Sequence, residues 1–343
     1  MKLGAAKVLR GLRSAAVLLL ASVAAGAKPV DDGRLELPRG ERAADSLEWL
    51  VQFDSGAVLL ALVAVHNLGP GDGRSSVIGY LLEPSGDSWR FSRSERPGHW
   101  SLSPDGSRMD LHQIRVQRSG ALRRLKVRKH DLRLELEVAA QGSPERLGPE
   151  QPSDCSATLL ESGAPATASF QAAGQEQPRA LRGRATLVHR RLRRAESRCI
   201  RRRLELFLQE PKLYLNLSHA TAADGGHRDA WLLRHGESAS APGGTPLVQV
   251  RWREGPAGAP QPVSLHAHQA GWTLEAQSRD RPLPIDLFAG MSRLRRALLR
   301  LRGQPSISLA RFSYRLRLPE GTGARRQWTG TAWVLTTYPG PWK

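Results

Sequence analysis

The segment Leu132–Val138, with the sequence LRLELEV, decides the fold class of this chain. Its apolar residues alternate with charged ones, so that one face of an extended segment is apolar and the other is polar. A period of two with one apolar face predicts a strand of an antiparallel sheet, which has a core on one side and water on the other.

Segments of the same kind recur along both halves of the chain, separated by turns rich in Gly, Pro, Ser and Asp. Leu47–Phe53 and Val58–His66 flank the turn Asp54-Ser55-Gly56 and predict a β-hairpin. Further strands are expected at 77–83, 89–92, 109–117 and 122–128, and in the second half at 182–191, 202–209, 212–218, 229–234, 247–254, 263–268, 272–277, 306–318 and 328–338. The fold class is therefore mainly β, with two consecutive antiparallel β-barrels or sandwiches.

Composition suggests where these two halves divide. Residues 143–177 are rich in Pro, Ser, Ala, Glu and Gly, and we expect them to form a linker. The first barrel is then expected over 36–142 and the second over 178–343. With 343 residues, the chain is long enough for two domains of this size.

One segment, Ile285–Arg302, departs from the alternation. Its apolar residues recur at steps of four and three, and arginines fill many of the other positions, a pattern that predicts a short basic amphipathic helix. We expect this helix mainly to cap one barrel end with its apolar face. A second role, contact with an anionic membrane surface, would use its arginines, Arg293, Arg295, Arg296, Arg300 and Arg302.

Residues 1–27 have the pattern of a signal peptide. Basic residues between Lys2 and Arg13 precede a short apolar stretch, and Ala25-Gly26-Ala27 has the form of a cleavage site. The apolar stretch is shorter than the roughly 20 residues that span a bilayer. We therefore expect an exported protein, in the bacterial periplasm or outside the cell.

The chain is strongly basic, with 51 Lys and Arg against 32 Asp and Glu and a formal net charge of +19. The densest basic run is Arg179–Arg203, and we expect it to form a solvated face. Aromatic residues do not interleave with this run as they do in proteins that bind single-stranded nucleic acid, so nucleic acid is not expected as a partner. The partner that we expect is a hydrophobic small molecule or lipid, with peripheral contact to an anionic membrane.

The chain contains two cysteines, Cys155 and Cys199. In an oxidising compartment they could form one disulfide, which would close a loop of about 45 residues. Two buried free thiols are the alternative, because the sequence does not show whether the two Cα atoms approach each other.

The sequence carries no motif of a nucleophile elbow, a phosphate-binding loop, a zinc protease or a dinucleotide-binding turn, and we expect no cofactor. His266 and His268 share one face of a strand and would hold a metal only with a third ligand that the sequence does not identify. Asp229, beside Trp231, is the one attractive candidate for a catalytic acid. An Asp in this setting is more often a plain turn or strand-end residue.

Several short motifs follow the order seen in a known group of proteins. They are Glu48-Trp49, Val58–Asn67, Trp100-Ser101, Leu181–His189 (LRGRATLVH), Asp229–Leu233 (DAWLL), Gly271-Trp272 and Gly330–Tyr338 (GTAWVLTTY). This order resembles the double-lipocalin-like group, which contains the fungal survival-factor proteins and the bacterial AttH and carotenoid 1,2-hydratase relatives.

The resemblance implies two lipocalin-like β-barrels that bind an apolar, lipid-like ligand and, in some members, hydrate or cyclise an isoprenoid. The residues that we expect at the ligand pocket are Trp49, Trp100, His189, Trp231, Trp272 and Trp333. Acid-catalysed hydration needs a carboxylic acid held protonated in an apolar pocket, whereas the strands of the second half carry many arginines and few acids. We therefore expect a non-enzymatic exported carrier of a hydrophobic ligand in the cell envelope, with a lyase or isomerase acting on an isoprenoid as the alternative.

Overall fold

The computed structural model describes residues 31–40, 42–67, 73–141, 144–147, 154–210, 213–235, 238–240, 246–255, 259–269, 271–286, 306–319 and 325–339. The signal peptide expected over residues 1–27 lies outside these ranges. Within them, the structure contains no helix with the length and apolar character needed to cross a membrane.

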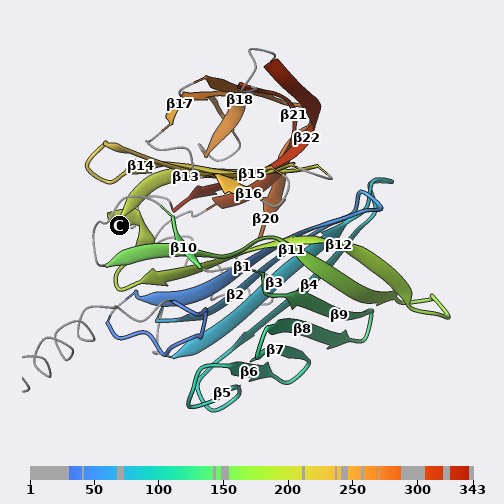
Figure 1. Cartoon of the computed structure of the whole chain (residues 1–343). Helices are drawn as coiled ribbons and strands as arrows, with labels where there is room; N and C mark the ends of the chain where they lie inside the picture. The colour runs from blue at the N-terminus through green and yellow to red at the C-terminus, as the bar shows by residue number, and fades with distance from the viewer. Residues whose placement is uncertain are drawn as a thin grey trace, which may run out of the picture. The chain divides into compact units, whose positions relative to one another are not determined.

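The first half of the chain forms one antiparallel sheet of 12 strands (Figure 1). Its strands are β1 (Ala44–Phe53), β2 (Val58–His66), β3 (Arg74–Leu82), β4 (Ser88–Glu95), β5 (Ser101–Leu102), β6 (Arg108–Leu111), β7 (Ile114–Ser119), β8 (Leu122–Lys129), β9 (Leu132–Ala139), β10 (Glu145–Arg146), β11 (Cys155–Ala172) and β12 (Arg179–Leu192). Their hydrogen-bonded order is β4-β3-β2-β1-β12-β11-β9-β8-β7-β6-β5, with β10 beside β11.

The second half forms a sheet of 10 strands, which follows the short 3-10 helix η1 (Glu196–Arg198). Its strands are β13 (Ile200–Glu210), β14 (Leu213–Ala222), β15 (His227–His235), β16 (Ser238–Ser240), β17 (Leu247–Glu254), β18 (Pro260–Gln269), β19 (Trp272–Ser278), β20 (Leu283–Ile285), β21 (Ser306–Pro319) and β22 (Arg325–Tyr338). The order is β16-β15-β14-β13-β22-β21-β19-β18-β17, with β20 beside β21.

The two sheets share one plan, in which the first strand of each half pairs with the last strand of the same half. In the first sheet β1 pairs with β12, and in the second β13 pairs with β22. The strands that follow the first one extend the sheet on its other side in both cases. The sheets form a half-barrel and a nearly closed barrel, so the prediction of a mainly β chain with two lipocalin-like units is confirmed.

The sheets divide later in the chain than the composition suggested. Residues 143–177, expected as a linker, contain β10 and all of β11, and β11 pairs with both β9 and β12 inside the first sheet. The first sheet therefore ends at Leu192, and the second begins at Ile200. Small inward residues such as Ala166 and Ala168 made β11 hard to recognise, because they give a weak hydrophobic alternation.

The helix expected over 285–302 lies almost entirely outside the described residues, as do Arg293, Arg295, Arg296, Arg300 and Arg302. Its first residue, Ile285, is not helical. It ends β20, pairs with Ile307 of β21 and is buried in an apolar cluster between the sheets. A β-branched residue suits this extended, packed position. Contact of the arginines with a membrane stays a prediction.

Large side chains fill the inner face of the first sheet. This core includes Trp49, Phe53, Phe91, Met109 and Phe170. The opposite face of the same sheet packs on the second sheet through a separate apolar cluster. That cluster joins Leu50, Leu60 and Tyr80 to Phe207 and Leu335.

Four buried charges lie in the same contact between the sheets. Arg190 of β12 contacts Glu48 of β1 (Nε to Oε1, 2.8 Å) and Glu205 of β13. Arg203 of β13 contacts Glu205 (3.4 Å) and Glu48 (3.2 Å), and it also binds Glu196 of η1 (2.7 Å). Each arginine thus contacts one glutamate of its own sheet and one of the other. The basic run Arg179–Arg203 was expected to be solvated, but the side chains of Arg190 and Arg203 are only 6% and 7% exposed.

The surroundings of Glu48 and Arg190 favour the ionised form of each. Burial raises the pKa of Glu48, but the charges of Arg190 and Arg203 lower it further, and the net pKa lies below the ordinary value of 4.5. Burial lowers the pKa of Arg190, while Glu205 and Glu48 raise it, with a net increase. Because the pKa of Glu48 is depressed in the folded state, its ionisation stabilises the fold at neutral pH, and this contribution is lost as the pH falls below 4.5.

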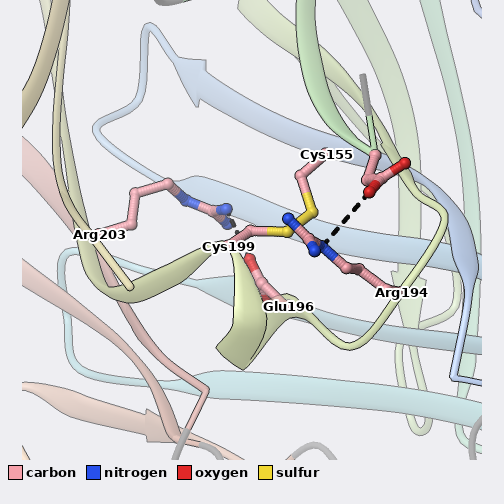
Figure 2. Close-up of a disulfide and its surroundings, with 6 residues drawn as sticks. Cys155, Arg194, Glu196, Cys199 and Arg203 are labelled. Carbon is pink, nitrogen blue, oxygen red and sulfur yellow. Dashed lines mark hydrogen bonds and ion pairs between the residues drawn. A yellow bond between two sulfur atoms is a disulfide. The ribbon is translucent and has the colours of Figure 1, made fainter. Parts of the chain in front are cut away.

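A disulfide joins the two sheets beside these charges. Cys155, the first residue of β11, is bonded to Cys199, which precedes β13, and their Cα atoms are 6.3 Å apart. The expected pairing is therefore confirmed. Figure 2 shows Glu196 and Arg203 next to the disulfide, together with Arg194, which contacts Asp154 at 3.6 Å. Among the described residues, no backbone ladder joins the two sheets that this bond links.

Replacing both cysteines with serine should lower the free energy of unfolding by about 4 kcal/mol, because the bond closes a loop between residues separated by 44 positions. The urea unfolding midpoint measures the loss. Wild-type protein reduced without denaturant should lose a similar amount. A double variant with the wild-type midpoint would show that the charges and the apolar cluster hold the sheets without the bond.

Glu48→Gln should lower the free energy of unfolding by about 3–5 kcal/mol at pH 7, because it leaves buried arginine charge uncompensated. The loss should shrink as the pH falls below 4.5, where Glu48 of the wild type becomes protonated as well. Urea titrations at several pH values measure both effects. The control, Glu275→Gln, removes a half-exposed partner of Arg315 (3.8 Å) and should cost less than about 1 kcal/mol. Equal losses in the two variants would contradict the cluster's role.

Candidate functional site

The inner face of the second sheet is apolar along most of its length. Its buried residues include Leu206, Leu215, Leu217, Leu265, Leu274, Phe312, Leu316 and Val334. They come from strands on both sides of β13, so the curvature of the sheet turns these faces toward one another. These side chains are buried and form the apolar core of the second sheet.

At one end of this face the side chains become polar. β13 and β15 begin there, and β14 ends there. We call this group the polar end, and it consists of Arg202, His219, Thr221, His227 and Asp229. Thr221 lies opposite Arg202 on one neighbouring strand and opposite His227 on the other, and His219 lies opposite Asp229. Because His219 and Thr221 continue the alternation of Leu215 and Leu217, they lie on the apolar side of the sheet.

His219 and Asp229 form a buried pair within the polar end. Nδ1 of His219 donates to Oδ1 of Asp229 at 2.6 Å, and their side chains are 4% and 9% exposed. The exposed ring of His227 stacks on His219, with centroids 5.3 Å apart and 21° between the planes. A carboxylate that accepts from Nδ1 fixes the tautomer of the imidazole, whose Nε2 can then accept a proton or a hydrogen bond.

Arg202 lies beside this pair and reaches across the curved sheet. Its Nε donates to Oγ1 of Thr221 at 3.2 Å, and its guanidinium lies 4.7 Å from the ring centre of Trp252 on β17. Trp252 also packs against the apolar core of the second sheet. Burial lowers the pKa of Arg202 from its ordinary value.

The residues predicted at the pocket in the first half belong to the structural core. Trp49 is buried at the centre of the first sheet, and Trp100 packs at the margin of that core while its Nε1 donates to the carbonyl of Gly73 (3.0 Å). His189 is buried on the same side and hydrogen-bonds Asp45 (2.5 Å). None of these three residues touches the polar end through the contacts that the described residues make.

The predicted residues of the second half divide between the two faces of the sheet. Trp272 is buried on the inner face, in the apolar core. Trp333 lies on the opposite face and packs against the cluster between the sheets. Trp231 pairs with Leu217 in the ladder, and its side chain lies outside the described part. Asp229 is joined to His219 and is therefore more than a plain strand-end residue.

His266 and His268 share a face as predicted, with ring centroids 5.7 Å apart, but both are exposed on the outside of the second sheet. Among the described residues, no group of three or more His, Cys, Asp or Glu side chains is placed to hold a metal ion. His266, Glu275 and Arg315 instead line a broad, open and polar hollow of about 1030 Å³ on this outer face.

The sequence analysis missed four residues of the site, namely Arg202, His219, His227 and Trp252. A signal for two of them was present. The turn Asp224-Gly225-Gly226 predicts a hairpin whose symmetric pairing brings residue 219 opposite residue 229 and residue 227 opposite residue 221. No local pattern connects Arg202 with Trp252, because β13 and β17 are brought together only by the curvature of the whole sheet.

Comparison with known proteins supports the fold. No model of a protein family matches the sequence, and no curated protein matches it. Solved structures that are similar in fold include the following three. A protein assigned as AttH from Nitrosomonas europaea has a TM-score of 0.59 at 13% identity, covering 91% of this chain and 99% of that one.

The other two structures are those of a hydratase and of a protein solved together with a small molecule. Kievitone hydratase from Nectria haematococca has a TM-score of 0.55 at 9% identity, covering 90% of this chain and 93% of its own. CghA with Sch210972 has a TM-score of 0.55 at 9% identity, covering 91% and 96%. At these identities the likeness concerns the fold alone, and the chain has the fold of the double-lipocalin-like group that its motif order resembles.

Proposed function

We propose that this chain is an exported binding protein or carrier for a hydrophobic, lipid-like ligand of the cell envelope, acting without catalysis. The observation that carries the proposal is the apolar inner face of the second sheet, which ends in a cluster of polar side chains. An amphiphile has the same distribution of polarity. Its tail would lie along the apolar face, and its head would lie at the polar end.

The first sheet is the less suitable place for a ligand. Its inner face is filled by large side chains, and the hollow beside Trp49 and Met109 measures about 20 Å³. A space of that size holds about one water molecule. We therefore propose that the ligand binds the second sheet, where polar side chains end the apolar face.

Two further observations support the proposal. A hydratase and a protein solved with Sch210972 share the fold, so this architecture accommodates small organic molecules in other proteins. The disulfide between Cys155 and Cys199 is the kind of bond that persists in oxidising compartments, as expected for an exported chain.

Adding 1-dodecanol, a neutral amphiphile, should change the tryptophan emission and raise the thermal midpoint of the protein. Trp272→Phe should remove most of the emission change, because Trp272 lies on the inner face of the second sheet. The control Trp100→Phe should keep it, because Trp100 packs in the first sheet. If dodecanol, a phospholipid and an isoprenoid alcohol all leave emission and midpoint unchanged, the carrier function is wrong.

A lyase or isomerase acting on an isoprenoid is the second candidate function, and one observation favours it. The buried pair of His219 and Asp229 lies at the polar end, where a reacting group of a bound ligand would lie. In this function Asp229 orients the ring of His219, and Nε2 of His219 moves a proton to or from the substrate.

If the chain catalyses such a reaction, His219→Gln and Asp229→Asn should each slow product formation by about 100-fold or more, because general acid–base catalysis contributes about that much. Binding of dodecanol should persist in both variants. The control His268→Gln, on the outer face, should react like the wild type. Chromatography of isoprenoid substrates and products measures turnover. A wild-type protein without turnover, or variants as active as the wild type, would exclude this role of the pair.

A further inference from the structure

We propose that the ligand of the second sheet carries an oxyanion, a carboxylate or a phosphate, as its head group, and that Arg202 binds it. This inference rests on the proposed binding function and specifies the chemical class of the ligand. The observation behind it is a partly buried cation on the inner side of the second sheet that forms no ion pair with the residues that the structure describes.

The register of the strands places Arg202 on the inner face. Arg202 lies opposite Thr221, and two positions further along β13 the buried Leu204 lies opposite His219. Leu204 belongs to the apolar core of the second sheet, and alternate residues of a strand share a face. The contact of the guanidinium with Trp252, another residue of the inner side, agrees with this placement.

The acidic groups near Arg202 are engaged elsewhere. Asp229 accepts from His219. Glu48 and Glu205 face the other side of the sheet, where they pair with Arg190 and Arg203. In the part of the chain that the structure describes, Arg202 forms no ion pair, and Thr221 is the acceptor of its hydrogen bond.

Arg202 is partly removed from water, and this partial burial disfavours its charged form. An anionic ligand would supply the missing charge. A carboxylate or phosphate also fits the planar fork of a guanidinium, to which it can form two parallel hydrogen bonds.

Trp252 restricts the orientation of the guanidinium of Arg202. A guanidinium held at 4.7 Å over an indole ring keeps its plane in a defined orientation. Nε donates a hydrogen bond to Oγ1 of Thr221, and a ligand anion would bind the Nη atoms. His227, which stacks on His219, lies on the neighbouring strand opposite Thr221.

The test compares three amphiphiles with one chain length, namely laurate, dodecyl phosphate and 1-dodecanol, by titration below their micelle concentrations. Wild-type protein should bind at least one of the two anions roughly 10- to 100-fold more tightly than the alcohol, because a hydrogen bond to a charged group contributes about that factor. Arg202→Gln should remove this preference and leave the affinity for dodecanol nearly unchanged. The arms for laurate and dodecyl phosphate distinguish a carboxylate from a phosphate head.

The matched control is Arg251→Gln, which removes the same charge from the residue next to Trp252 but on the exposed outer side of β17. It should keep the preference for the anion. Arg202→Lys keeps the charge without the planar fork and should retain only part of the preference, which provides a second variant if Arg202→Gln unfolds early in a thermal melt.

The measurements distinguish a failure of the proposed binding function from a failure of the proposed role of Arg202. If none of the three amphiphiles binds wild-type protein, the proposed function is wrong and this inference falls with it. If the wild type binds the alcohol as tightly as both anions, or if Arg251→Gln loses the preference as fully as Arg202→Gln, the binding function stands and the role of Arg202 is overturned.

Discussion

Two arginines and two glutamates buried between the sheets are the interaction on which the rest of the structure depends. Arg190 and Arg203 each contact Glu48 and Glu205, so each cation is shared between the sheets. Moving one sheet past the other would leave buried charges unpaired, which costs several kcal/mol. The neighbouring apolar cluster around Leu50 stabilises the contact, but apolar burial does not depend on one exact orientation of the sheets. The buried charges pair in only one relative position of the two sheets. The disulfide adds a covalent link between the two sheets at the edge of the same contact.

β13 links the contact between the sheets to the candidate site, because it contains both Arg203 and Arg202. Its successive residues point to opposite faces, so Arg203 binds the charges between the sheets while Arg202 points into the second sheet. Fixing Arg203 therefore also fixes the backbone that presents Arg202 to Trp252. A binding group on a rigid strand with its orientation set before the ligand arrives loses little freedom on binding. The polar end is in this sense a consequence of how the two sheets are joined.

Strand patterns could be predicted from the sequence, and long-range pairing could not. The segment LRLELEV forms β9, and Leu47–Phe53 with Val58–His66 forms the β1–β2 hairpin, because local alternation and turn residues determine both. β11 was assigned to a linker, since its small residues alternate weakly. The burial of Arg190 was missed for another reason: its partner Glu205 belongs to the other sheet, and no local signal separates a paired arginine from a solvated one. Of the site, Asp229 was recognised, but its partner His219 required the register of a hairpin.

The pairing of the first strand with the last in each sheet determines the order in which the chain can fold. β1 finds its neighbour β2 at once, but its other neighbour, β12, begins only at Arg179, and Ala44 pairs with Leu192. A chain emerging from its amino terminus therefore keeps one side of β1 without a hydrogen-bonded partner until the whole first half has appeared. Contacts so distant in sequence slow folding, and an open strand edge can pair with a neighbouring molecule during that interval. The same holds for β13, which waits for β22 at the end of the second half. This topology makes the nascent chain dependent on protection from self-association for most of its synthesis.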